Sequence, residues 1–134
     1  MRRPIVVGNW KMNMLISSSR NWIEELLNTS DCAGTFDIVV APPFTSLSVV
    51  RQYIEGSKIQ LAGQNMASKA EGAQTGEISA IMLKDAGCDY VILGHSERRQ
   101  YHNESDELIN KKIFLACENA LSVIFCIGES INER

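Results

Sequence analysis

The chain contains the stretch Tyr90-Val91-Ile92-Leu93-Gly94-His95-Ser96-Glu97-Arg98-Arg99, in which five polar or charged side chains follow a short apolar run and one glycine. Tyr90–Gly94 is predicted to be a buried strand, and core packing does not explain the side chains directly behind it. The pattern recurs near the N-terminus, where Pro4-Ile5-Val6-Val7 is followed by Gly8-Asn9-Trp10-Lys11-Met12-Asn13. In sheets and barrels of parallel strands, the chemistry lies where the strands end. Two such strand exits therefore predict one shared site.

Short runs rich in Val and Ile are apolar on both faces, as parallel strands buried on two sides are. The predicted strands are Ile5–Gly8, Asp37–Ala41, Ile59–Ala62, Tyr90–Gly94 and Val123–Gly128. Between them, apolar side chains recur at helical spacing. Thr45 is the expected N-cap of the second helix, and Lys112 falls on the stripe of the last one. The predicted helices are 18–28, 45–55, 79–86 and 105–119. This alternation predicts an α/β fold with a parallel sheet and right-handed crossovers.

The composition excludes several classes of partner. The chain has 134 residues, 45% of them hydrophobic, and a formal net charge of -3. It lacks the basic stripe that a nucleic-acid interface needs. Its apolar stretches are far shorter than the roughly 20 residues of a membrane span. The apolar run after Arg3 is also too short for an export signal. We therefore expect neither nucleic acid nor membrane as a partner, and residues 1–134 as part of one domain.

The four cysteines are scattered and form no CxxC pair. Each lies in or beside an apolar segment, so a disulfide framework and a zinc site are both disfavoured. We expect them to be small core residues of a protein in a reducing compartment. They are Cys32, Cys88, Cys117 and Cys126.

The connection from Gly63 to Ile78 is long, polar and without clear periodicity. Compact domains rarely carry a structureless loop longer than about 12–15 residues unless it has a function or is disordered. The segment carries few net charges and several alanines, which favours a loop that docks on something. A mobile surface loop is the alternative.

Six motifs resemble the triosephosphate isomerase family, in the family's order and spacing. They are Gly8-Asn9-Trp10-Lys11-Met12-Asn13, Ala41-Pro42-Pro43, Gly63-Gln64-Asn65, Gly72-Ala73-Gln74-Thr75-Gly76-Glu77, Gly94-His95-Ser96-Glu97-Arg98-Arg99 and Cys126-Ile127-Gly128-Glu129. The resemblance implies a parallel (β/α)₈ TIM barrel. A complete barrel needs about 250 residues. We therefore expect this chain to hold about the first five strands and four helices.

The resemblance implies a cytoplasmic enzyme of glycolysis and gluconeogenesis that interconverts glyceraldehyde 3-phosphate and dihydroxyacetone phosphate through an enediolate. It implies no cofactor and no metal. The family's general-base glutamate and mobile lid follow the sixth strand, and its phosphate-binding N–H groups follow strands seven and eight. All of these are expected beyond Arg134, so a polypeptide limited to residues 1–134 is expected to be inactive.

The family's electrophile and active-site lysine match His95 and Lys11. In the family, a neutral histidine polarises the substrate carbonyl, and a fixed ammonium stabilises the developing oxyanion. By residue type alone, His95 could also be a hydrogen-bonded core histidine and Lys11 a solvated surface residue. Asn9 is expected to bind substrate and help position Lys11. Ser96 and Glu97 are expected to support the site, with Glu97 paired either to Lys11 or to a neighbouring arginine.

The family is homodimeric, and its interface loop matches residues 63–78. The loop tip corresponds to Thr75, Gly76 and Glu77, and it docks in the family near the position of Met12. Gln64 is expected to support this interface loop. Cys126 and Glu129 match the family's fifth-strand motif and are expected to give packing support and a contact to the sixth loop, respectively.

Three hypotheses follow. In the first, the sequence is an incomplete record of a genuine isomerase. In the second, it is a non-catalytic, stand-alone half-barrel that self-associates to cover its open edges. The third is a different phosphate-handling barrel enzyme, against which the motif around His95 argues.

Overall fold

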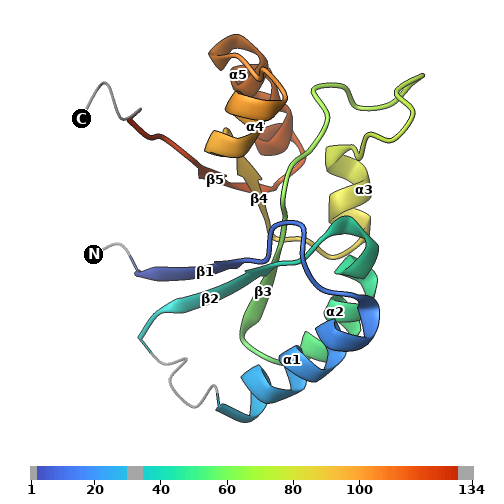
Figure 1. Cartoon of the computed structure of the whole chain (residues 1–134), viewed down its shortest axis with the longest axis vertical. Helices are drawn as coiled ribbons and strands as arrows, with labels where there is room; N and C mark the ends of the chain where they lie inside the picture. Colours follow the sequence, from blue (N-terminus) through green and yellow to red (C-terminus); the bar gives the residue numbers. More distant parts are fainter. Residues whose placement is uncertain (1–2, 30–34, 130–134) are drawn as a thin grey trace.

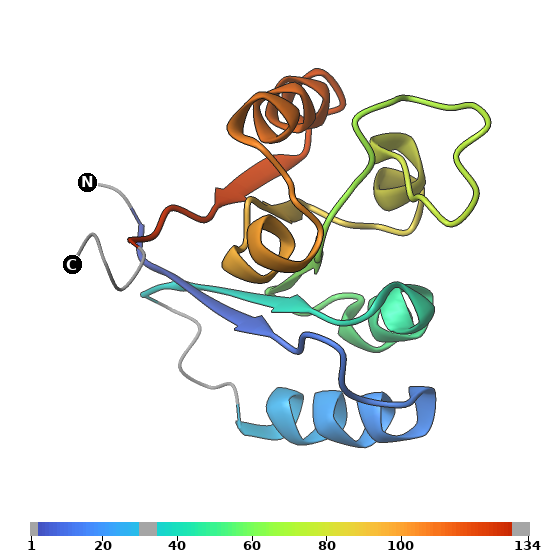
Figure 2. The same cartoon turned by 45° about the horizontal axis from the view of Figure 1, so that its top comes forward.

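A computed structural model of the chain describes residues 3–29 and 35–129. Its sheet is built from five parallel strands in the order β1-β2-β3-β4-β5, so neighbours in the sheet are also neighbours in the chain. Figures 1 and 2 show the sheet curling, with the helices on its outer side. The strands are β1 (Ile5–Asn9), β2 (Asp37–Ala41), β3 (Ile59–Gly63), β4 (Tyr90–Leu93) and β5 (Ser122–Phe125).

The helices follow the predicted alternation, with one helix more than expected. The described elements are α1 (Ile16–Thr29), the 3₁₀ turn η1 (Phe44–Ser46), α2 (Leu47–Ile54), α3 (Ala80–Asp85), α4 (Ser96–Tyr101) and α5 (Asp106–Glu118). The additional helix is the short α4, which lies between β4 and α5. Ser79 and Ser105 cap α3 and α5 by accepting hydrogen bonds from Met82 and Leu108 N–H groups.

Alternate residues of the strands build two cores. On the inner, concave side, Val39 and Ala41 of β2 pack with Ala62 and Ile92. On the outer side, Val40 joins the larger cluster that the helices cover. Side chains on a strand alternate between its faces, so a strand buried on both sides must be apolar at every position. This is why the strands of this chain read as continuous apolar runs.

Two local expectations need correction. Thr45 is not the N-cap of α2, because it lies inside η1 and Ser46 precedes the helix instead. Cys117 is exposed on α5, where the neighbouring Ala116 takes the buried position. Cys88 is buried as expected and Cys126 is partly buried, whereas Cys32 lies outside the described residues.

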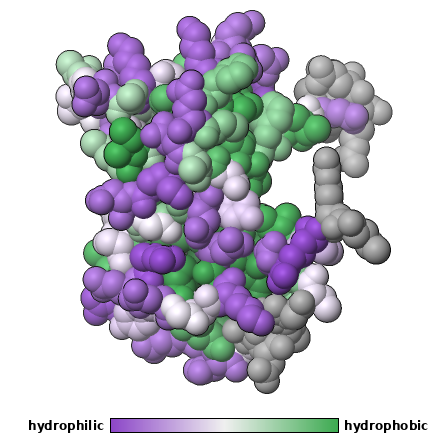
Figure 3. Space-filling view, turned by 180° about the vertical axis from the view of Figure 1, so that it is seen from behind, coloured by the Kyte–Doolittle hydropathy of each residue, from purple (hydrophilic) through white to green (hydrophobic). Residues whose placement is uncertain are grey.

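The edge strands leave apolar side chains in solvent. Val6 of β1 and Phe125 of β5 are about half exposed, and Ile127 just beyond β5 is 80% exposed. β1 and β5 are the two opposite edges of the sheet. Figure 3, seen from behind, shows hydrophobic surface that reaches one side of the molecule.

Candidate functional site

Lys11 and Glu97 meet at the carboxyl ends of β1 and β4. Lys11 Nζ donates a 2.7 Å hydrogen bond to Glu97 Oε1. Of the two partners left open by the sequence, the lysine is therefore the one that Glu97 takes. The hydrogen bond from Lys11 is the main cause that holds the pKa of Glu97 below its usual value. Glu97 is therefore a carboxylate at neutral pH, and the two charges are held side by side.

The backbone of Lys11 is strained and held from both sides. Its φ is 54°, in the left-handed region that L-residues rarely adopt. The Asn9 side chain accepts a 3.0 Å hydrogen bond from the Lys11 N–H. On the other side, Gln64 Nε2 donates to the Lys11 carbonyl at 2.9 Å and to the Ala41 carbonyl at 2.8 Å. These hydrogen bonds hold the Lys11 backbone in a left-handed conformation that an L-residue would otherwise leave.

His95 is the N-cap of α4 and is held by the first turn of that helix. Its Nδ1 accepts a hydrogen bond of 3.3 Å from the backbone N–H of Glu97. Accepting this hydrogen bond requires that Nδ1 carry no proton, which leaves the proton of a neutral imidazole on Nε2. The side chain is 22% exposed, so it is accessible without being fully solvated. The imidazole can therefore donate a hydrogen bond to a ligand. Ser96, next to it, is exposed.

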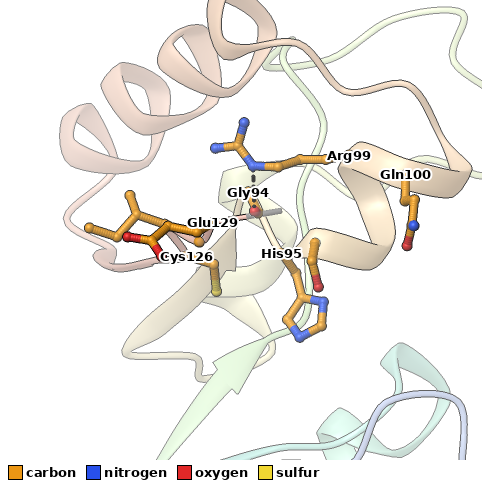
Figure 4. A pocket seen from close by; sticks show the side chains of 9 residues that line it. Gly94, His95, Arg99, Gln100, Cys126 and Glu129 are labelled. Carbon is orange, nitrogen blue, oxygen red and sulfur yellow. Dashed lines mark hydrogen bonds between the residues drawn. The ribbon is translucent and has the colours of Figure 1, made fainter. Parts of the chain in front are cut away.

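A cavity of about 600 Å³ opens beside His95. Figure 4 shows its lining, with the imidazole of His95 and the guanidinium of Arg99 on opposite sides of Gly94. It is lined by the two residues after β4, by α4 and by the segment after β5, including Gln100, Cys126 and Glu129. Asn9 and Lys11 are not among the lining residues. Burial raises the pKa of the Cys126 thiol, so this group is neutral in the cavity wall.

A buried ionic cluster supports α4 and α5, and sequence reasoning missed it. Lys112, only 4% exposed, donates to Glu104 Oε1 at 2.6 Å and to Asn65 Oδ1 at 3.0 Å. Arg98 Nε donates to the same Glu104 oxygen at 2.6 Å. Burial works to raise the pKa of Glu104, but Lys112 and Arg98 outweigh it and hold that pKa below its usual value. The sequence held one signal of this cluster, the position of Lys112 on the apolar stripe of its helix, because a buried charge requires a partner of opposite charge.

The loop between β3 and α3 projects from the body of the molecule in both Figures 1 and 2. The Ala67 N–H donates to the Ile78 carbonyl at 2.8 Å and closes the base of the loop. Its tip residues Thr75, Gly76 and Glu77 are exposed. Met12, which belongs to the loop after β1, is 96% exposed. Gln64 lies apart from the tip, at the base.

Within residues 3–29 and 35–129, no three His, Cys, Asp or Glu side chains lie together as a metal site would require. No helix of these ranges has the length and hydropathy needed to cross a membrane.

A curled parallel sheet with helices outside and polar side chains at the carboxyl ends of its strands defines an α/β barrel protein. The chain forms five parallel strands of such a barrel. A family model described as triosephosphate isomerase matches residues 4–134. The chain therefore belongs to the triosephosphate isomerase family, and its fold is part of a (β/α)₈ barrel.

Proteins named triosephosphate isomerase from several bacteria are similar to the whole chain. Identity over 134 residues is 48% for the protein of Thermoanaerobacter pseudethanolicus, 48% for that of Alkaliphilus metalliredigens and 49% for that of Dictyoglomus turgidum. Each match covers 100% of this chain and 54% of the relative. The chain thus spans about half the length of the curated relatives it matches.

Proposed function

We propose that the chain is the N-terminal part of a triose-phosphate isomerase, which interconverts D-glyceraldehyde 3-phosphate and dihydroxyacetone phosphate through an enediolate in cytoplasmic glycolysis and gluconeogenesis. The observation that carries the proposal is the meeting of Lys11, His95 and Glu97 at one end of the sheet, with Glu97 in contact with both. Family membership supplies the substrate class.

His95 acts as the electrophile in this proposal. Its Nδ1 is occupied by the Glu97 N–H, so the proton on Nε2 is available to the substrate oxygen. A neutral donor of this kind is established for the triosephosphate isomerase family. A donor fixed before the reaction stabilises the developing enediolate oxygen without reorganising during the step.

Lys11 binds the substrate and stabilises the same negative charge. The strained backbone and the Glu97 carboxylate hold its ammonium in place, so little side-chain freedom is lost on binding. Asn9 contributes by accepting the Lys11 N–H and by its place at the end of β1. The proton-abstracting base is assigned to a glutamate after the sixth strand, and none of these three residues replaces it.

The complete protein is proposed to be a homodimer through residues 63–78. The exposed tip at Thr75, Gly76 and Glu77 fits a docking loop. Exposed apolar side chains also lie on the neighbouring loops and on α3, which favours an interface on this face. They are Met12, Phe44, Ile81 and Met82.

The test uses a complete enzyme, in which residues 1–134 are joined to the C-terminal half of the Thermoanaerobacter relative. Isomerisation of glyceraldehyde 3-phosphate is followed with a coupled dehydrogenase. His95→Gln is expected to lower kcat by about 10²–10³-fold, the loss seen when one oxyanion donor is removed. His102→Gln is the control, because His102 is exposed and caps the other end of the same helix. A His95→Gln enzyme within tenfold of the parent excludes the electrophile.

A self-associating half-barrel is the second candidate. It is favoured by exposed apolar side chains at both edges of the sheet, Val6 on β1 and Phe125 and Ile127 at β5. Paired copies would cover these edges without any catalysis. Both candidates expect residues 1–134 alone to associate without catalysis, so the gene separates them: a stop codon directly after the Arg134 codon would support this candidate, and a continuing reading frame the first.

A further inference from the structure

Arg99 contacts the backbone that carries His95. Its Nε donates a 2.8 Å hydrogen bond to the carbonyl of Gly94, which belongs to the peptide bond between Gly94 and His95. Figure 4 shows this bond, with the imidazole on the far side of Gly94 from the guanidinium. A hydrogen bond from a charged donor is roughly twice as strong as one between neutral groups. Arg99 therefore fixes the plane of the peptide from which His95 projects, without touching its ring.

Gly94 is the residue that this arrangement needs. Its φ is 73°, in the left-handed region, and a Cβ built there would lie 3.0 Å from Arg99 Nη2. The same Cβ would lie 3.2 Å from the Cys126 carbonyl oxygen and from the Phe125 ring. A side chain at this position would push away the guanidinium. The glycine thus allows both the turn and the close approach of Arg99.

Asp106 anchors the other side of the guanidinium. Its Oδ1 accepts from Arg99 Nη1 at 2.6 Å, and it is the first residue of α5. The Asp106 side chain is 83% exposed, whereas that of Arg99 is 31% exposed. The arginine is therefore held by two fixed acceptors, one on α5 and one at the end of β4. This links the orientation of His95 to the start of α5.

We propose that Arg99 is a positioning residue for His95, acting through the Gly94 carbonyl and anchored by Asp106. The inference rests on the proposed function, because it assumes that the imidazole acts on the substrate. Catalytic groups must be held within about 0.5 Å of the productive geometry. Releasing the Gly94–His95 peptide should therefore reduce the rate of the chemical step more than it weakens substrate binding.

The kinetic test uses the joined enzyme described above. Arg99→Ala is expected to lower kcat about tenfold, since misplacement by a fraction of an ångström costs part of the 10²-fold lost per ångström. KM should stay within about twofold of the parent value, because the variant weakens an interaction that His95 makes in the transition state and not in the bound substrate. Ethylguanidinium added to Arg99→Ala should restore part of kcat.

If Arg99→Ala unfolds, a second variant, Asp106→Asn, still tests the proposal, because the Asp106 side chain is largely in solvent. Asp106→Asn should lower kcat about threefold and leave KM unchanged. Glu107→Gln, in the same helical turn, is the control and should change neither constant. Unchanged kcat in both Arg99→Ala and Asp106→Asn would overturn the proposal. So would a loss in Arg99→Ala that ethylguanidinium does not restore while Asp106→Asn keeps full kcat.

A readout without turnover separates this inference from the proposed function. The ¹⁵N resonances of His95 report which ring nitrogen carries the proton. In Arg99→Ala and Asp106→Asn the Nδ1 resonance should move as the bond from the Glu97 N–H loosens, whereas in Glu107→Gln it should not. If the parent enzyme is inactive but the Nδ1 resonance moves in both variants, the proposed isomerase function is rejected and the positioning role of Arg99 is kept. If the parent enzyme is active but the Nδ1 resonance moves in neither variant, the isomerase function is kept and the positioning role is rejected.

Discussion

Lys11 Nζ lies 2.7 Å from Glu97 Oε1, although 86 positions of the chain separate the two residues. Both residues lie just beyond the carboxyl ends of strands, Lys11 after β1 and Glu97 after β4. The pairing neutralises the lysine only partly, since both side chains are about half exposed. An ammonium held in this way keeps its charge available to an incoming anion.

Lys11→Ala is therefore expected to raise KM and lower kcat together in a complete enzyme. The charge acts on both the bound substrate and the transition state, so neither constant alone should carry the loss. Steady-state kinetics with glyceraldehyde 3-phosphate measure both constants. Lys58→Ala is a control at the opposite ends of the strands, and an unchanged kcat/KM in Lys11→Ala would remove Lys11 from the site.

The buried Lys112 is expected to be a major contributor to stability. Lys112→Met leaves Glu104 with Arg98 as its remaining cation and should cost about 3 kcal/mol, the lower end of the range for breaking a buried ion pair. Lys111→Met, one position earlier and exposed, should stay within about 0.5 kcal/mol. Urea unfolding of both variants compares them. Equal stability of the two would show that the cluster contributes nothing.

Acid should weaken this cluster in a defined direction. The pKa of Glu104 is lowered from 4.5 in the folded chain, so the unfolded chain binds the proton first. The unfolding free energy contributed by Glu104 is therefore complete above pH 4.5 and is lost as the pH falls through the folded-state pKa. Urea midpoints between pH 7 and pH 3 measure the loss. Lys112→Met should make this loss smaller, because the folded-state pKa of Glu104 moves back toward 4.5, and a loss as large as that of the parent would contradict the assignment.

The cysteines should differ sharply toward iodoacetamide. Burial is the main cause that raises the pKa of the Cys88 thiol from 9.0 to about 12, whereas Cys117 is exposed. The thiolate is the reactive form, so Cys117 should be labelled in the native protein and Cys88 only after unfolding. Mass spectrometry of peptides locates the label. Labelling of Cys88 at the native rate of Cys117 would mean that the outer core opens readily.

A polypeptide limited to residues 1–134 should show no isomerase activity. The proposed base lies outside it, and loss of a general base removes about 10²–10⁴-fold of the rate by itself. Its apolar edges should also drive self-association, which light scattering and dye binding detect. Turnover by this polypeptide, purified free of host isomerase, would mean that a residue within it acts as the base, with Glu97 the first candidate.

The sequence predicted the strands and most helices well because their patterns are local. Val39, Val40 and Ala41 show a doubly buried strand without reference to any other residue. The α4 helix was not among the four helices predicted from periodicity, because its six polar-rich residues carry no apolar stripe. The Lys11–Glu97 pair was left open because Arg98 and Arg99 are equally good partners by charge. Only the positions of the strand ends decide between them.

The sheet's order of strands has a consequence for how the protein is made. Every described pairing joins a strand to the one synthesised just before it. Each of the strands β2 to β5 therefore finds a partner strand that has already emerged from the ribosome. Because loop closure between such neighbours is short, assembly can advance stepwise with synthesis, at about 5–20 residues per second. The growing edge, rather than any finished surface, is then the part exposed to chaperones.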